Sequence, residues 1–430
     1  MPNLEVIQAI RGMGEVPPEV SWHFQYLQAR FQDLLSTYGY TEIRLPLLER
    51  TELFKRGIGE STDIIEKEMY TFVDRGGDSV SLRPEGTAGC VRAAIEHGLL
   101  YHQIQKLFYM GPMFRYERPQ KGRLRQFHQL GAEAFGFVGP EVDAEILAMT
   151  ARFFKNLGIL SEVELQINTL GLPEERASYR NALVQYFEKH QSHLDEDSQR
   201  RLLTNPLRIL DSKNPALAEL IAKAPKMLEF LGKESRQYFE GVKQSLDTLK
   251  IPYRVVSTLV RGLDYYTHLV FEWVSTDLGS QGTVCAGGRY DRLVEEFGGE
   301  STPGIGFAMG LERLVLLLNV KNQFPPAKNI DIYVVVLNDS LFNHALKLSE
   351  RLRDAHPELK MMLNTQGGGA KNQFKRADKS GAKLALILGE EEVGRSEVLI
   401  KFLREAEQAQ CSVKITELSA WLEKNLGVEE

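Results

Sequence analysis

The sequence is short of the residues that would place it in several large classes of protein. Its three cysteines, Cys90, Cys285 and Cys411, are far apart and odd in number. They form neither a disulfide framework nor a metal-binding motif, and they fit a reducing, cytoplasmic setting. No apolar run reaches the roughly 18–20 residues that a membrane helix needs, so we expect no membrane contact. The first residues do not have the pattern of a secretory signal.

An excess of positive charge is also missing. Lys and Arg number 52 against 58 Asp and Glu, which gives a formal net charge of −6. Such a chain does not coat nucleic acid through bulk charge, although a local basic patch remains open. A chain of 430 residues, 43% of them hydrophobic, predicts a globular protein with several domains.

Apolar spacing predicts the elements of a long first part. Residues 20–38 have helical spacing and stop at Gly39, and TEIRLPLLE (41–49) is predicted to be a strand that contains Pro46. Residues 106–136 predict two strands around a charged loop. The stretch of about 174–250 is polar and helical, which predicts an inserted helical module.

A second part follows NQFPPAKNID (322–331), whose adjacent prolines predict a linker. Strand-like segments at 330–337, 360–364 and 383–389 then alternate with helix-like segments at 340–355 and 371–381, which predicts a separate α/β domain. Lys371, Lys375, Arg376, Lys379 and Lys383 within it are either a solvated helix face or a nucleic-acid contact.

The most basic segment is FRYERPQKGRLRQ (114–126), where Glu117 is the one acid among five basic residues. It is either a solvated hairpin tip or a binding loop. In the strand after it, a period of two places Gln129 and Glu133 on one face with Phe127. A buried carboxylate needs a partner, so Glu133 predicts either a cationic ligand group or a structural arginine.

Three further segments each allow a structural and a functional interpretation. In SLRPEGTAG (81–89), Thr87 can cap a helix or Glu85 can point into a site. In GIGFAMGLERLVLLL (304–318), Arg313 lies on an apolar helix and is expected to need an anion. CAGGRYDRL (285–293) taken alone predicts an exposed turn.

The segment VRGLDYYTHLVFEW (260–273) is predicted to be a strand, interrupted by an arginine and two tyrosines. It is either a polar strand end or a pocket for a small molecule that is anionic and aromatic.

Together these segments resemble the three class-defining motifs of class II aminoacyl-tRNA synthetases. VRGLDYYTHLVFEW and AGGRYD resemble segments peculiar to the histidyl-tRNA synthetases, and the C-terminal part is similar to their anticodon-binding domain. Leu269 departs from the pattern, which has a hydroxyl residue there, and is expected to face away from the tyrosine pair.

The resemblance implies an α/β (α+β) fold: an antiparallel class II catalytic domain over 1–325 and an anticodon-binding α/β domain over 329–430. It implies that L-histidine is activated with ATP and Mg²⁺ and transferred to the 3′-end of tRNA(His). It assigns no protein residue to the metal. It also implies a homodimer, for which helix 20–38 and the strand with Pro46 offer a surface.

The site residues follow from the same resemblance. The residues implied to bind histidine are Glu85, Thr87, Arg115, Gln129, Glu133, Arg261, Tyr265, Tyr266 and Tyr290. Those implied to bind ATP are Arg115, Glu117, Arg123, Phe127 and Arg313, and Gln120 and Arg125 are implied to approach tRNA. Arg261, Arg115 and Arg313 are the expected catalytic residues.

Three other hypotheses remain open at this point. A histidine-binding regulatory paralogue would lack charging activity, but such proteins typically lose the anticodon domain and the arginines. A different class II synthetase would have no use for the tyrosine pair and Glu133. A non-enzymatic nucleic-acid-binding protein is disfavoured by the net charge.

Overall fold

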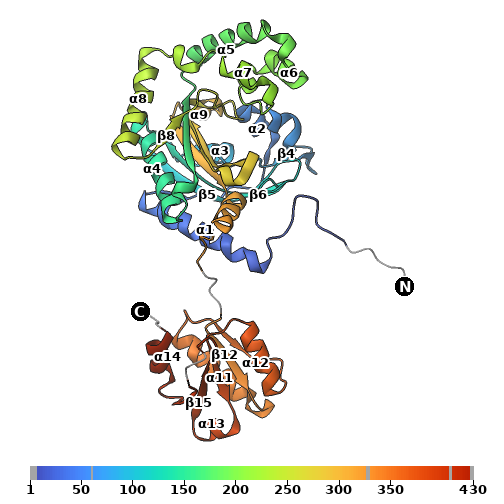
Figure 1. The fold of residues 1–430 in the computed structure, drawn as a ribbon, viewed down its shortest axis with the longest axis vertical. Coiled ribbons are helices and arrows are strands. Elements are labelled where there is room, and N and C mark those ends of the chain that lie inside the picture. The colour runs from blue at the N-terminus through green and yellow to red at the C-terminus, as the bar shows by residue number, and fades with distance from the viewer. Residues whose placement is uncertain (1–6, 60–61, 326–329, 406–408, 427–430) are drawn as a thin grey trace, which may run out of the picture. The chain divides into compact units, whose positions relative to one another are not determined.

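The computed structural model describes residues 7–59, 62–325, 330–405 and 409–426. The chain divides between Phe324 and Pro325 into two compact units, each with its own sheet (Figure 1). Residues 326–329 of the predicted linker lie outside the described residues. The two units are described separately.

An eight-stranded sheet is the frame of the first unit, in the order β1-β5-β6-β11-β10-β9-β7-β8. The strands are β1 (Thr41–Glu42), β5 (Gln105–Phe114), β6 (Gln126–Phe135), β7 (Glu164–Thr169), β8 (Tyr253–Val255), β9 (Thr267–Val274), β10 (Thr283–Arg289) and β11 (Gly304–Gly310). The six inner strands pair antiparallel, as predicted. Each edge strand pairs parallel with its neighbour, which the sequence did not indicate.

The two faces of this sheet have different roles. The helices that pack on them are α1 (Pro18–Thr37), α3 (Thr87–Glu96), α4 (Pro140–Asn156) and α10 (Leu311–Val320). Phe31 of α1, Phe153 of α4 and Leu314 of α10 share one apolar core. The cluster on the opposite side includes α3 together with Tyr109 and Tyr290. Tyrosines therefore gather on the second side, where the candidate site lies.

Helix α1 is confirmed, and Gly39 follows it with φ +78°, a conformation that suits glycine. Its apolar face packs into the core of its own unit, so that face does not by itself indicate a partner. The single strand predicted over 41–49 is wrong. Pro46 separates β1 from β2 (Leu48–Arg50), and Arg83 donates hydrogen bonds to the carbonyls of Leu45 and Pro46.

Strand β2 belongs to a second, small sheet in the order β2-β4-β3. Its other strands are β3 (Thr71–Val73) and β4 (Ser79–Leu82). Short helical elements used below are α2 (Thr51–Ile58), the π-helical turn η1 (Ile64–Glu68) and α9 (Leu293–Glu296). Both edges of this sheet carry exposed apolar side chains, among them Leu48 and Val73.

The strand predicted over 260–273 exists only from Thr267 onward. Residues 261–266 are irregular because their hydrogen-bond partners come from other elements rather than from a neighbouring strand. At the start of β9, Arg289 pairs with Thr267 but Gly288 pairs with Val270, which marks a β-bulge, and His268 has φ +41°. Leu269 packs in the core on the far side from Tyr265, as expected.

The exposed turn predicted for CAGGRYDRL is wrong. Residues 283–289 form an inner strand, β10, and Arg289 and Asp143 are a fully buried ion pair at 2.5 Å. Tyr290 is also buried. A buried pair satisfies an arginine that would otherwise have to stay at the surface, and the sequence gave no sign of its distant partner.

The predicted insertion is helical throughout its described length. Its helices are α5 (Pro173–Glu188), α6 (Glu196–Thr204), α7 (Ala218–Ala222) and α8 (Lys233–Thr248), with 3₁₀ turns that include η4 (Pro206–Ile209). In Figure 1 these helices lie beside the large sheet, in green and yellow-green.

The second unit has a five-stranded sheet in the order β13-β12-β14-β15-β16. Its elements are β12 (Ile332–Val336), α11 (Phe342–Ala355), β13 (Met361–Leu363), α12 (Ala370–Lys379), β14 (Leu384–Leu388), α13 (Glu390–Gly394), β15 (Glu397–Phe402), β16 (Cys411–Lys414) and α14 (Leu418–Leu426). The predicted elements up to β14 are confirmed, whereas the later ones were not foreseen. Within the described ranges, no helix has the length and apolar character needed to cross a membrane.

Candidate active site

A cavity of about 340 Å³ brings together most of the residues that the sequence singled out. Those that line it are Glu85, Thr87, Arg115, Glu117, Arg123, Phe127, Gln129, Arg261, Tyr265, Tyr266, Tyr290 and Arg313. They come from β6, the loop between β5 and β6, the start of α3 and the turn before it, the loop before β9, the residue just after β10, and α10. Glu133 lies directly behind this wall, whereas Gln120 and Arg125 do not line the cavity.

Glu133 is fully buried on β6 and accepts three hydrogen bonds from hydroxyl groups. Thr87 Oγ1 donates at 2.8 Å and Tyr109 Oη at 2.9 Å, and Tyr290 Oη is the third donor. Burial raises the pKa of Glu133 to about 8, although the three hydroxyls oppose the rise. The predicted structural arginine is not among the described partners, so the site leaves Glu133 in a polar but cation-free setting.

Tyr109 was missed by the sequence analysis. It lies opposite Gly131 in the β5–β6 pairing, and its ring occupies the space that a side chain at Gly131 would fill. A tyrosine facing a glycine across a predicted hairpin was a usable signal, since such a ring can pass over the neighbouring strand.

Glu85 both caps α3 and lines the cavity. Its carboxylate accepts the backbone N–H groups of Thr87 at 2.6 Å and Ala88 at 2.9 Å. The cap is thus supplied by Glu85, and Thr87 is the first residue of the helix. Burial raises the pKa of Glu85. A carboxylate has about four acceptor positions, so two remain for a ligand.

Three arginines crowd one side of the cavity. Arg115 Nε donates to the carbonyl of Pro84 at 2.9 Å, and its guanidinium lies 5.3 Å from the ring centre of Phe127. Arg313 donates to the carbonyls of Gly122 at 3.0 Å and Thr283 at 2.6 Å. Burial, together with the charges of Arg115 and Arg123, lowers the pKa of Arg313 to about 10. This mutual repulsion favours a polyanionic ligand.

Arg261 has a carboxylate partner that the sequence analysis did not name. It forms an ion pair with Glu272, whose other oxygen accepts from Thr283 Oγ1 at 2.9 Å. The Arg261 guanidinium lies 5.7 Å from the Tyr266 ring centre. Although burial opposes it, the pKa of Arg261 is raised by Tyr266 and Glu272. Arg261 is therefore a fixed, charged group.

Gln129 Oε1 and Arg261 Nε are among the buried polar atoms of cavity-lining residues that have no hydrogen-bond partner within the part of the chain that the structure describes. Such atoms are costly unless something pairs with them. Beside them, the rings of Tyr265 and Tyr290 meet edge to face at 5.6 Å. The pocket thus has polar atoms that lack a hydrogen-bond partner within the described residues, and these atoms lie next to aromatic walls.

The charged loop between β5 and β6 folds on itself. Arg123 forms ion pairs with Glu117 and, at 3.9 Å, with Glu68, a residue of η1 that the sequence analysis did not single out. Gln120 is exposed, and Arg125 stacks on the Tyr116 ring at 3.9 Å. The loop is therefore held by its own ion pairs at the rim of the cavity and is not only a solvated tip.

Comparison with known proteins agrees with this geometry. The family profile for histidyl-tRNA synthetase matches residues 12–314, and that for an anticodon binding domain matches residues 331–425. The apo histidyl-tRNA synthetase of S. aureus is 37% identical, with a TM-score of 0.81 over 97% of this chain and 99% of that one.

The chain belongs to the histidyl-tRNA synthetase family. Membership over nearly the whole chain supports an enzyme that ligates histidine to tRNA, and it does not favour the regulatory paralogue. Family members are class II synthetases, which use ATP.

Two more distant structures share the fold. A histidyl-tRNA synthetase from Nostoc is 22% identical, with a TM-score of 0.69 over 98% of this chain and 100% of that one. A Bacillus halodurans protein described as an ATP phosphoribosyltransferase regulatory subunit/histidyl-tRNA synthetase is 21% identical, with a TM-score of 0.65 over 90% and 99%. At these identities the likeness concerns the fold alone.

Proposed function

We propose that the cavity on β6 binds L-histidine and ATP side by side and forms histidyl-adenylate, which then charges tRNA(His). The observation that carries this proposal is Glu133, a buried carboxylate held by hydroxyls at the base of a cavity lined with arginines. An imidazole presents one N–H donor and one acceptor nitrogen, and Glu133 with the hydroxyls around it offers the complementary groups.

Histidine is proposed to lie with its ring toward Glu133 and Tyr266. Glu85 and Thr87 hold its ammonium group, because Glu85 keeps free acceptor positions beside the start of α3. Arg261 and Gln129 hold its carboxylate, which is supported by the unpaired buried Nε–H of Arg261, and the Gln129 amide would donate through its nitrogen. The remaining contacts are aromatic, with the ring pocket walled by Tyr265 and Tyr290.

ATP is proposed to lie against the arginine side. Its adenine stacks on Phe127, its α-phosphate meets Arg115, and its γ-phosphate meets Arg313. Glu117 and Arg123 order the loop over the nucleotide through their ion pair. The lowered pKa of Arg313 supports this placement, since the phosphates would relieve the repulsion among the arginines.

Mg²⁺ is proposed to accompany ATP. This ion keeps several waters and binds through one or two carboxylates together with phosphates. Glu272 and Glu312 line the cavity, so the donor set fits a metal held mainly by the nucleotide. When bound with ATP, the ion would neutralise charge on the leaving pyrophosphate.

The first reaction needs no general base, because the histidine carboxylate is already a nucleophile. Its oxygen forms a bond to the α-phosphorus while the bond to the pyrophosphate oxygen breaks. The contribution of the protein is to align the two groups and stabilise the charge that moves, through Arg261 and Arg115. In the second step a hydroxyl at the tRNA 3′-end forms an ester bond to the histidyl carbonyl carbon while the bond to the phosphate breaks and AMP leaves, with Gln120 and Arg125 toward the acceptor end.

The second unit is proposed to take the anticodon through single-stranded base contacts. On α12 and just after it, the side chains of Lys371, Lys375, Lys379 and Lys383 are exposed, so they are open to such contacts or to solvent. We further propose the cytoplasm as the compartment, since all three cysteines are free.

A homodimer is proposed for the enzyme. The small sheet exposes Leu48, Phe72 and Val73 by 45%, 47% and 68%, and Leu47 beside it by 44%. Exposed apolar residues gathered on one small sheet are typical of an interaction surface. The expected result is twice the chain mass by light scattering at micromolar concentration, and a monomeric mass would contradict the proposal.

The test of the function is ATP–pyrophosphate exchange with each amino acid in turn, followed by charging of tRNA(His). Exchange with histidine alone, together with charging, is the expected result. Histidine binding without exchange would support the regulatory paralogue, and exchange with another amino acid would mean a different synthetase.

A further inference from the structure

The loop that carries Arg261 is held in place by the helical insertion. Residues 261–266 belong to no strand. Arg176 of α5 donates to the carbonyl of Tyr266 at 2.6 Å, and Asn205 donates to Asp264 Oδ1 at 3.0 Å. A β-carbon placed on Gly262 would lie 3.6 Å from Arg208 Nη1. Thus the insertion holds the backbone of Tyr266 and the side chain of Asp264, and the carbonyl of Ile58 in α2 accepts the Asp264 backbone N–H at 3.1 Å.

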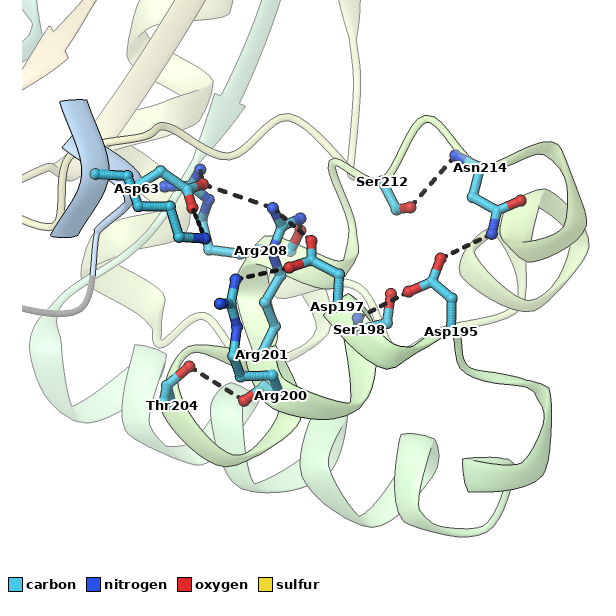
Figure 2. Close-up of polar contacts among 11 residues, drawn as sticks. Asp63, Asp195, Asp197, Ser198, Arg200, Arg201, Thr204, Arg208, Ser212 and Asn214 are labelled. Atoms are coloured by element: carbon cyan, nitrogen blue, oxygen red, sulfur yellow. Dashed lines mark hydrogen bonds and ion pairs between the residues drawn. The ribbon is translucent and has the colours of Figure 1, made fainter. Parts of the chain in front are cut away.

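Arg208 of η4 also binds Asp63, a residue outside the insertion. Its Nη2 lies 3.1 Å from Asp63 Oδ2, and Arg201 Nη2 lies 3.5 Å from the same oxygen (Figure 2). The side chains of Arg208, Arg201 and Asp63 are only 16%, 23% and 32% exposed. A pair that is this far removed from solvent is screened less than a surface ion pair.

Asp63 lies immediately before η1, and this turn reaches the nucleotide side of the cavity. The carbonyl of Glu68, the last residue of η1, accepts the N–H of Tyr116 at 2.6 Å. The Glu68 carboxylate lies 3.9 Å from Arg123, and its charge also acts on Arg115. Arg208 is therefore connected both to the loop of Arg261 and, through Asp63, to the loop of Arg115.

We propose that Arg208 is a positioning residue for adenylate formation. By binding Asp63 and bracing the loop at Gly262, it holds Arg261 and Arg115 in position on either side of the α-phosphate. This assignment rests on the proposed adenylation activity. It gives the insertion a part in a step that involves no tRNA, which an insertion that served only to bind tRNA would not have.

The test is histidine-dependent ATP–pyrophosphate exchange without tRNA, measured for Arg208→Gln and Asp63→Asn. Misplacing reacting groups by a fraction of an ångström typically costs rate, so we expect kcat to fall roughly tenfold to a hundredfold, with a smaller change in the KM for histidine. The double variant should be no slower than the worse single variant, because the two residues act as one unit. Arg208→Lys should restore part of the rate.

Arg200→Gln is the matched control. Arg200 lies on α6, the helix just before the η4 turn that carries Arg208, pairs with Asp197 at 2.7 Å and is 49% exposed, so its loss should leave exchange unchanged. Normal exchange by a folded Arg208→Gln variant, with only tRNA charging impaired, would overturn the proposal. Should that variant not fold, unchanged exchange by Asp63→Asn would overturn it equally. Absence of exchange in the unmodified protein would instead refute the proposed function.

Discussion

Glu133 is expected to affect both the stability of the protein and its choice of substrate. It is buried among Thr87, Tyr109 and Tyr290, and its pKa is about 8, so most of it is protonated at neutral pH. A carboxyl group near its pKa can either donate to an imidazole nitrogen or accept from one. If histidine binds as proposed, an apolar isostere of its ring would forgo the hydrogen bond to this group, which favours histidine over such a ligand.

We expect Glu133→Gln to raise the KM for histidine while leaving that for ATP nearly unchanged. Leaving a buried polar group of the ligand without its partner costs roughly 1–3 kcal/mol, or about fivefold to a hundredfold. Exchange kinetics with each substrate varied in turn would show the split. An unchanged KM for histidine would mean that Glu133 does not contact the ligand.

The same variant should change how stability depends on pH. Because the pKa of Glu133 rises from 4.5 to about 8 on folding, the folded state binds its proton more tightly. Its contribution is fully present below pH 4.5 and is lost as the pH rises to about 8. Relative to the unmodified protein, Glu133→Gln should therefore gain in Tm between pH 5 and pH 8. A constant Tm difference would contradict the raised pKa.

Arg261→His is expected to slow adenylation far more than it weakens histidine binding. The remaining contacts from Glu85, Gln129 and Glu133 still hold the amino acid, but the fixed charge beside the α-phosphate is gone. Losing one preorganised contact of this kind typically costs about 10²–10³-fold in rate. Single-turnover adenylate formation at saturating substrates is the measurement, with Arg200→His as a control. A normal rate constant with a raised dissociation constant would make Arg261 a binding residue only.

At the scale of elements, the hairpin of β5 and β6 could be predicted because its alternation and its charged loop are local features. The same holds for α1 and for the first five elements of the second unit. What failed depended on distant partners. Arg289 looked exposed because nothing near it in sequence pairs with it, yet Asp143 does so in the core. Residues 261–266 looked like a strand because their brace, from Arg176 and Asn205, comes from the insertion.

Most of the candidate site could be found from sequence by resemblance, but its supporting residues could not. Tyr109, Glu272 and Glu68 each act through a residue that the motifs contain. None of them lies at a motif position that we had singled out. Their roles follow from strand register and loop contacts, which composition and spacing do not encode.

Strand β11 offers a prediction at this scale. A β-carbon on Gly306 would lie 2.6 Å from the carbonyl oxygen of Ala132 and would run into the Glu133 carboxylate. Gly306→Ala should therefore destabilise the protein by about 1–3 kcal/mol, as overpacking does, and impair histidine binding. Gly14→Ala, which has nothing within 4 Å of the added carbon, is the control for thermal unfolding. Equal Tm values for the two variants would contradict the close packing of β11 on β6.

At the scale of the whole molecule, the proposed function divides the reaction between the two units. The residues proposed to bind histidine and ATP all lie before Phe324, and each unit has an apolar core of its own. Deleting residues 329–430 should therefore spare adenylate formation, because no reacting group is removed and the sheet that positions them is intact. Aminoacylation should fall strongly, because the proposed anticodon contacts are lost while the acceptor-end contacts alone must hold tRNA.

The truncated protein and the full chain would be compared in exchange and in charging at equal concentration, with circular dichroism to confirm folding. Full charging by a folded truncated protein would show that the second unit is dispensable for tRNA selection, and loss of exchange would show that the first unit depends on it.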